Sequence, residues 1–158
     1  MFTFKLIQLI ETRAERLSDA LMKRLKNSNR CNQLLQRVPP HEVRKRSHEI
    51  YYNLNDWLRN KTESEIEERY VGLGIRRAKQ GVPFTDFVWA VRLTKECLWE
   101  LMEAEGLFAE PIDLFGGIDL LHSLDRFFDR ILYFAAVGYQ SARVESEQAT
   151  HLHAVAHG

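Results

Sequence analysis

The chain has 158 residues, of which 45% are hydrophobic and 28% charged, and its 22 Lys and Arg residues balance 22 Asp and Glu residues. This length fits one domain with a single core, and the composition argues against a disordered chain or a bundle of membrane helices. The longest uncharged apolar run, residues 131–142, is shorter than the roughly 20 residues that a spanning helix needs. We therefore expect a globular protein without a membrane segment.

The start of the chain and its two cysteines indicate a reducing compartment. Charges at Glu11, Arg13 and Glu15 interrupt the apolar beginning before a signal-peptide core could form. Cys31 and Cys97 lie far apart and in no spacing typical of a metal or redox site. We expect a cytoplasmic protein.

Basic residues are more frequent in the first 60 residues, and acidic residues are more frequent in the rest of the chain. Such asymmetry can mark a nucleic-acid-binding face. Here the basic residues alternate with acids along helical patterns, which favours solvated helix faces. Nucleic-acid binding is therefore the weakest functional hypothesis, although the first helix offers several cations: Lys5, Arg13, Arg16, Lys23, Arg24 and Lys26.

Apolar residues in steps of three and four predict one helix from Phe4 to about Lys26. Its stripe consists of Ile7, Ile10, Ala14, Leu17, Leu21 and Leu25. After a break and a short apolar piece, Pro39 and Pro40 mark the start of a second helix, because proline fits the first helical turn. That helix should bury Val43, Ile50, Leu54, Trp57 and Leu58.

A third helix is predicted after Thr62, because a threonine followed three residues later by Glu65 is typical of a capping box. Its inward face should consist of Ile66, Tyr70, Leu73 and Ala78. Gly81 suits a helix C-terminus, where positive φ is common, and Pro83 suits the start of the next helix. Residues 80–83 are thus predicted to separate two helices.

The helix predicted from Phe84 to Glu103 is apolar on nearly every side, as is typical of a central helix. A long helical pattern then runs from Pro111 to about Glu147, with a predicted break at residues 116–117. No long strand pattern is present. We predict an all-α fold with five or six helices in one bundle over residues 1–147, for which a globin-like arrangement is one candidate, and a flexible tail or linker over residues 148–158.

Candidate chemistry is sparse. No histidine follows a glutamate by three residues, as a di-iron bundle requires, and no nucleophile stands in a recognisable catalytic spacing. We therefore predict no enzymatic activity, no metal and no cofactor. His122, which has apolar neighbours along its helix, is the best candidate for a haem ligand. It keeps open the alternative of a helical sensor that binds haem or another ligand.

Two groups of residues are candidates for binding. Aromatic and charged side chains of the second half suggest a small pocket, although aromatic residues more often fill a core. The candidate pocket or core residues are Arg77, Trp89, Arg92, Trp99, Phe128, Asp129 and Tyr139. The N-terminal stripe offers a candidate dimer seam, which could equally pack within one chain. The seam residues are Ile7, Ile10, Leu17 and Leu21.

Residues 70–102 and 124–140 resemble the N-terminal domain of the RsbR-type co-antagonists of RsbT, a module similar to input domains of some bacterial sensor kinases and transcription regulators. The matching features are Leu73-Gly74, Arg77, residues 80–83, residues 87–91, Trp99, Asp129 and Gly138-Tyr139. The first 60 residues match only as helices of suitable length. The resemblance implies a non-enzymatic sensory domain that dimerises and passes a signal onward, in RsbR proteins to a STAS output domain within a large signalling complex.

The C-terminal residues leave one further alternative. The ending "HAVAHG" resembles the approach to the phospho-accepting histidine of a sensor kinase, with His157 in that place, so the chain could be an N-terminal fragment of such a kinase. His151, His153 and His157 could also bind a metal, but a solvated tail or linker is favoured. The expected partners are a second copy of the chain and a signalling protein or an output domain outside these residues.

Overall fold

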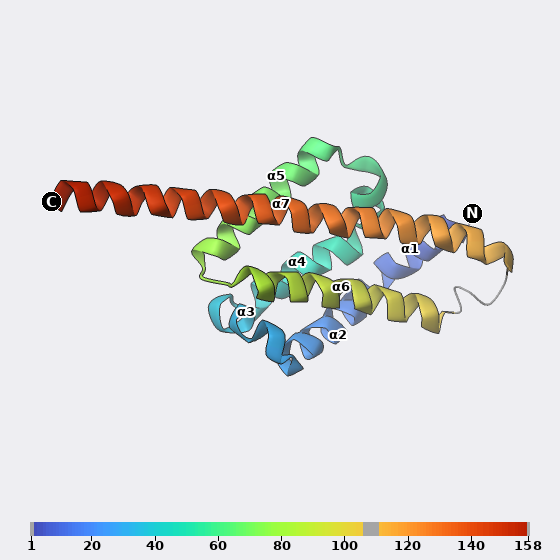
Figure 1. Ribbon diagram of the computed structural model, residues 1–158. Helices are drawn as coiled ribbons and strands as arrows, with labels where there is room; N and C mark the ends of the chain where they lie inside the picture. The colour runs from blue at the N-terminus through green and yellow to red at the C-terminus, as the bar shows by residue number, and fades with distance from the viewer. Residues whose placement is uncertain (1, 106–110, 158) are drawn as a thin grey trace.

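The computed structural model describes residues 2–105 and 111–157, which are helical almost throughout (Figure 1). The elements in chain order are α1 (Phe2–Thr12), α2 (Ala14–Asn27), the 3₁₀-helix η1 (Asn29–Cys31), α3 (Asn32–Arg37), α4 (Pro40–Tyr52), the π-helix η2 (Asp56–Asn60), α5 (Glu63–Lys79), α6 (Phe84–Ala104) and α7 (Pro111–His157). The described residues contain no strand, so the all-α class is confirmed. None of their helices combines the length and hydrophobicity that crossing a bilayer requires.

Helix α7 runs along the whole molecule and continues well beyond the other helices at its C-terminal end (Figure 1). It packs chiefly on α5, while α2 packs on both α4 and α6 beside them. Between these helices lies the core, whose largest fully buried side chains include Tyr51, Phe127, Phe128, Leu98 and Met102. The buried part of α7 therefore belongs to the core of the domain.

The N-terminal helix that the sequence predicted as one piece is divided at Arg13. The backbone N–H of Arg13 lies 3.1 Å from both Leu9 O and Ile10 O, and its φ of −102° and ψ of 19° are not helical. No proline or glycine marks this division. Together with the short helix α3, it brings the α-helices of the described residues to seven, where five or six were predicted. The number of helices could not be predicted from apolar spacing alone.

The candidate dimer seam is buried inside the single chain. Ile7, Ile10, Leu17 and Leu21 expose 1%, 0%, 5% and 1% of their surfaces, because α1 and α2 turn this stripe toward α4, α6 and α7. The stripe therefore packs within one chain, which is the alternative to a dimer seam that its spacing left open. These four side chains could reach a second copy only by leaving the core.

The sequence signals around α5 are confirmed. Thr62 accepts a hydrogen bond from the Glu65 N–H at 3.2 Å, and the Glu65 carboxylate accepts one from the Thr62 N–H at 2.7 Å, which completes the capping box. At the other end Gly81 has a φ of 80°. The Val82 N–H donates to Arg77 O at 3.1 Å in a Schellman motif, so residues 80–83 do separate α5 from α6.

Helix α7 differs from its prediction at both ends. It continues through residues 116–117, where a break was predicted, because a glycine inside a helix costs only about 1 kcal/mol and the turns that follow bury Leu120 and Leu124 in the core. It also continues through residues 148–157, where the sequence predicted a flexible tail or linker. All side chains of residues 143–157 are exposed.

Candidate functional site

Two glycines allow α5 and α7 to cross in backbone contact. A Cβ atom added to Gly138 would lie 2.3 Å from Val71 O, and one added to Gly74 would lie 2.3 Å from Ala135 O. Neither distance is compatible with any side chain, and the opposing atoms belong to backbone that cannot turn aside. The position of α7 on the domain is therefore set by these two residues.

Tyr139 fastens α7 to the turn between α5 and α6. Its hydroxyl donates a hydrogen bond to Val82 O at 3.0 Å, and its ring packs against Phe84 and Phe87 with centroids 4.9 and 6.1 Å away. Burial raises the pKa of Tyr139, so the phenol remains a neutral donor. The turn that ends α5 thus also holds α7.

We expect Tyr139→Phe to destabilise the domain by about 0.5–1.5 kcal/mol, because Val82 is buried and its carbonyl would lose this donor. Urea unfolding followed by circular dichroism measures the change. Tyr133→Phe, at a tyrosine that is 67% exposed on the same helix, is the control and should leave stability unchanged. Equal midpoints for the two variants would contradict a structural role for the Tyr139 hydroxyl.

A charged pair of a buried Arg77 and a partly buried Glu42 joins α4 to α5 beside the crossing. Arg77 is only 3% exposed, and its Nη1 donates to an oxygen of Glu42 and to Gln80 Oε1, both at 2.8 Å. Arg76 donates to the same carboxylate from the solvent side, with its Nε 2.5 Å from Oε1. Hydrogen bonds from Arg76 and then Arg77 lower the pKa of Glu42 to about 2. The carboxylate is therefore charged over the whole physiological range.

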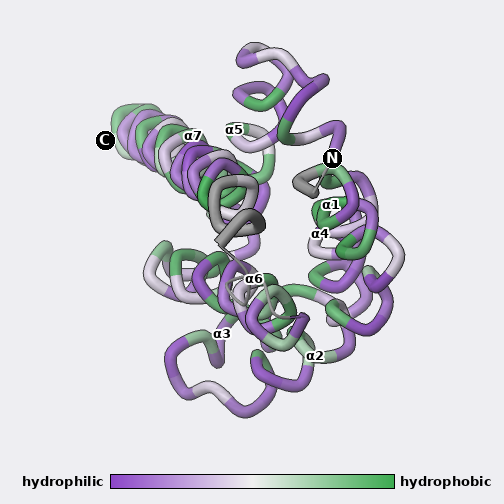
Figure 2. The backbone as a smooth tube through the Cα atoms, turned by 90° about the vertical axis from the view of Figure 1, so that its right-hand side faces the viewer, coloured by the Kyte–Doolittle hydropathy of each residue, from purple (hydrophilic) through white to green (hydrophobic). Residues whose placement is uncertain are grey.

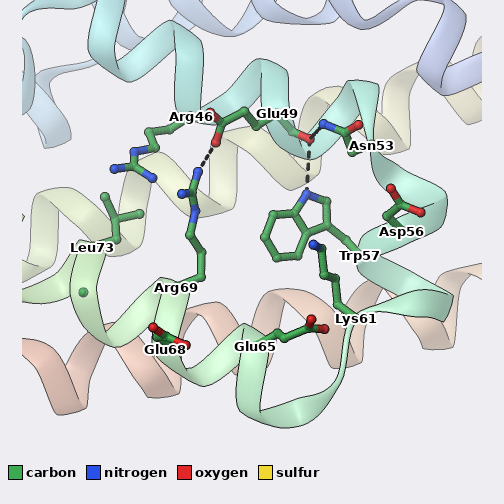
Figure 3. Close-up of a pocket in the computed structure, with 11 residues that line it drawn as sticks. Arg46, Glu49, Asn53, Asp56, Trp57, Lys61, Glu65, Glu68, Arg69 and Leu73 are labelled. Atoms are coloured by element: carbon green, nitrogen blue, oxygen red, sulfur yellow. Dashed lines mark hydrogen bonds and ion pairs between the residues drawn. The ribbon is translucent and has the colours of Figure 1, made fainter.

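A polar groove of about 730 Å³ lies between α4, η2 and α5 (Figure 3). On its wall, Glu49 O accepts hydrogen bonds from Trp57 Nε1 and Asn53 Nδ2, both at 3.2 Å. The carboxylate of Glu49 pairs with Arg69 (Figure 3). Both signs of charge line the groove, through Arg46, Glu49, Asp56, Lys61, Glu65, Glu68 and Arg69. It is open to solvent and holds no cluster of metal ligands among the described residues.

The structure does not gather the seven candidate pocket residues into one site. Arg77 and Phe128 line the same small cavity in the core, and Tyr139 lies close enough to Arg77 for that charge to act on its pKa. Trp89 lies elsewhere on α6, and its ring centre is 4.5 Å from the guanidinium carbons of both Arg30 and Arg92. Trp99 is half-buried at the edge of the core, and Asp129 is exposed on α7.

His122 is exposed on α7, where it lines a surface depression together with Asp125 and Asp129. A haem ligand would have to face an enclosed apolar space large enough for a porphyrin. The core cavity lined by Phe128 has a volume of about 70 Å³ and His122 does not line it. These positions therefore give the haem hypothesis no support.

Sequence reasoning assigned no role to Glu42, Arg46 or Glu49. Arg46 and Glu49 line the groove, and Glu42 pairs with Arg76 and Arg77. Arg46 belongs to the basic run of residues 44–46, which has the pattern of a solvated helix face. The only local signal for Glu42 is its place in the first turn of a helix, where acids are common for reasons of helix capping and dipole. The pairing of Glu42 and Glu49 with α5 and the place of Arg46 beside α5 depend on how the helices pack, so neither could be predicted locally.

The fold and the crossing define an all-α domain organised around one long helix that continues past its core. Comparison with protein families identifies the domain further, because the family described as the RsbT co-antagonist protein RsbRD N-terminal domain matches residues 14–153. The chain belongs to this family. The match includes most of the first 60 residues, which the sequence resemblance covered only as helices. No curated protein sequence and no solved structure matches the chain.

Membership of this family makes the chain a signal-transduction domain of the RsbR co-antagonist type, which is a regulatory domain and not a known enzyme family. The family resemblance drawn from residues 70–102 and 124–140 is thus confirmed. Several of the residues that carried it serve the crossing described above. Gly74 and Gly138 permit the backbone contact, while Arg77 and Tyr139 fasten the neighbouring helices.

Proposed function

We propose that this chain is a non-enzymatic input module that dimerises and relays a signal through helix packing to an output domain or a partner protein. The observation that carries the proposal is that α7, a single helix of 47 residues, has a buried part and an exposed part. Its central part is buried in the core, the side chains of residues 143–157 are exposed, and its C-terminal end extends past the other helices (Figure 1). Family membership supports a signalling role for the domain.

A continuous helix is a suitable relay because its hydrogen bonds make it stiff over several turns. Leu124, Phe128 and Ile131 anchor α7 in the core, each 1–2% exposed. A change in how α5 and α6 pack would shift or rotate these anchors. The same shift or rotation would reach residues 143–157, in the way that small helix movements act at interfaces in other switches.

The exposed end of α7 also offers a surface for a second copy of the chain. Val144, Leu152 and Val155 are 52%, 68% and 65% exposed. Val144 and Val155 are eleven residues apart, which returns a helix to nearly the same face after three turns, and Leu152 lies beside them. Hydrophobic and hydrophilic segments alternate along this part of α7 (Figure 2). We propose that two α7 helices pair through this apolar stripe, residues 144, 152 and 155.

Multi-angle light scattering at micromolar concentration tests the pairing. We expect the parent chain to have the mass of a dimer, and Val144→Glu combined with Val155→Glu to have half that mass, because four carboxylates would face one another in the pair. Thr150→Glu is the control, since Thr150 is exposed on the opposite face of the same helix. A monomeric parent chain, or a double variant that keeps the dimer mass, would contradict the proposal.

A further inference from the structure

A small cavity lies where the helices of the proposed relay meet. Its volume is about 70 Å³, and α4, α5, α6 and α7 all contribute to its wall. The wall is mostly apolar and includes Ile50, Leu73, Phe87, Val91, Phe128 and Ile131. Since one water-sized sphere needs about 10–15 Å³, the cavity has room for roughly five groups of that size. It can accept a short aliphatic chain.

Arg46 is the charged group that connects this cavity with the groove of Figure 3. Its side chain lines both, and so does Leu73, so the two spaces share a wall there. Arg46 is half-buried, and within residues 2–105 and 111–157 it makes no hydrogen bond or ion pair. A half-buried guanidinium without an anion is unfavourable, because it loses hydration and gains nothing in return.

The nearby acids are already engaged by other cations. Glu42 is bound by Arg76 and Arg77, and Glu49 is paired with Arg69. Burial, followed by the charge of Arg69, lowers the pKa of Arg46, and the more distant charges of Glu49 and Glu42 offset this only in part. An external anion at this position would therefore be stabilised by Arg46, whose guanidinium has no ion-pair partner among the described residues.

We propose that this cavity and Arg46 together bind a short-chain carboxylate, with the aliphatic tail in the cavity and the carboxylate on Arg46 at the edge of the groove. A planar carboxylate matches the planar guanidinium, and a tail of about three to five carbons matches the space. Phosphate alone would leave the apolar cavity empty, and an amino acid would bring its ammonium group close to Arg46 and Arg69. The inference deepens the proposed input function by naming the ligand class, because a tail among four helices would alter their packing.

Isothermal titration calorimetry of the full chain with unbranched carboxylates tests the proposal. Acetate, butanoate, pentanoate and octanoate are titrated at constant ionic strength. We expect affinity to rise from acetate to pentanoate and to fall for octanoate, and pentanamide to bind at least about tenfold more weakly than pentanoate. Undetectable binding at millimolar pentanoate, equal affinity for the amide, or an affinity independent of chain length would overturn the proposal.

Two substitutions test separately the binding of the carboxylate and the binding of the aliphatic tail. Arg46→Gln should weaken pentanoate binding at least about tenfold, while Lys45→Gln, an exposed neighbour on α4, should leave it unchanged. Val91→Phe should weaken pentanoate by filling the cavity and leave acetate unaffected. Thermal melting confirms that each variant is folded; if one is not, the amide comparison on the parent chain decides. These titrations are independent of the dimer mass, so this proposal and the proposed function can fail separately.

Discussion

Gly138→Ala should destabilise the domain by about 2–4 kcal/mol, a large effect for the addition of one methyl group. The added Cβ would lie 2.3 Å from Val71 O and 2.8 Å from the backbone nitrogen of Ile75. Because both atoms belong to the backbone of α5, the clash can be relieved only if the two helices separate. Guanidinium chloride unfolding, followed by circular dichroism, measures the loss.

Gly72→Ala is a matched control, because it adds the same methyl group to α5 at a position outside the contact with α7. Nothing lies within 4 Å of a Cβ added to Gly72, although it precedes Gly74 by only two residues on α5. Alanine is a better helix former than glycine, so this variant should be more stable than the parent chain by about 0.5–1 kcal/mol. If Gly72→Ala and Gly138→Ala shifted the midpoint in the same direction, the crossing would not depend on backbone contact.

The double variant Gly74→Ala with Gly138→Ala distinguishes a shared contact from two separate defects. Gly74 Cα lies 3.0 Å from the Cβ that Gly138 would acquire, so both substitutions act on one crossing. Once the first methyl group has separated the helices, the second should cost little. We therefore expect a loss well below the sum of the single losses, whereas independent sites would add.

The features that the sequence predicted well are those set by a few neighbouring residues. The capping box of Thr62 and Glu65 and the Schellman motif at Gly81 depend on local hydrogen bonds and on one positive φ. Their residue types are therefore diagnostic wherever the chain folds. The same holds for the all-α class, which follows from apolar spacing repeated along the whole chain.

The features that the sequence missed depend on packing between distant segments. Arg13 divides the first helix without a glycine or proline, and residues 116–117 continue a helix despite two glycines. The candidate seam shows a related limit of sequence-based prediction. An apolar stripe specifies that a helix face is buried, but Ile10 and Leu17 have the same spacing whether the partner is their own chain or a second copy.

The candidate pocket residues also show that local sequence does not predict which distant side chains come together. Trp89 and Phe128 were grouped because both are aromatic and lie in apolar helices. The Trp89 ring is close to the guanidinium groups of Arg30 and Arg92, whereas Phe128 lines the core cavity. Arg46 was not selected, since nothing in its local sequence distinguishes it from Arg44 or Lys45. Its special position results from the packing of α4 against the helices that form the cavity and the groove, and only the fold reveals that.

Glu42→Gln should destabilise the domain by on the order of 2–3 kcal/mol at pH 7, because Arg77 would remain buried without an anion. Substitution of Arg76, the exposed partner of Glu42, is the control. Arg76 is 54% exposed, so solvent already screens its interaction with Glu42, and Arg76→Gln should cost less than about 1 kcal/mol. Similar losses for the two variants would show that the buried pair has no special role.

The same pair predicts how stability depends on pH. The pKa of Glu42 is lowered from 4.5 to about 2 in the folded chain, so the folded state holds the charged form more strongly than the unfolded state does. This contribution is complete above pH 4.5 and disappears as the pH falls toward 2. The stability difference between the parent chain and Glu42→Gln, measured by urea unfolding, should therefore be constant from pH 7 to 5 and shrink below that. A difference that stayed constant down to pH 2.5 would mean that Glu42 acts through its shape and hydrogen bonds, and that its charge contributes nothing to holding α4 against α5.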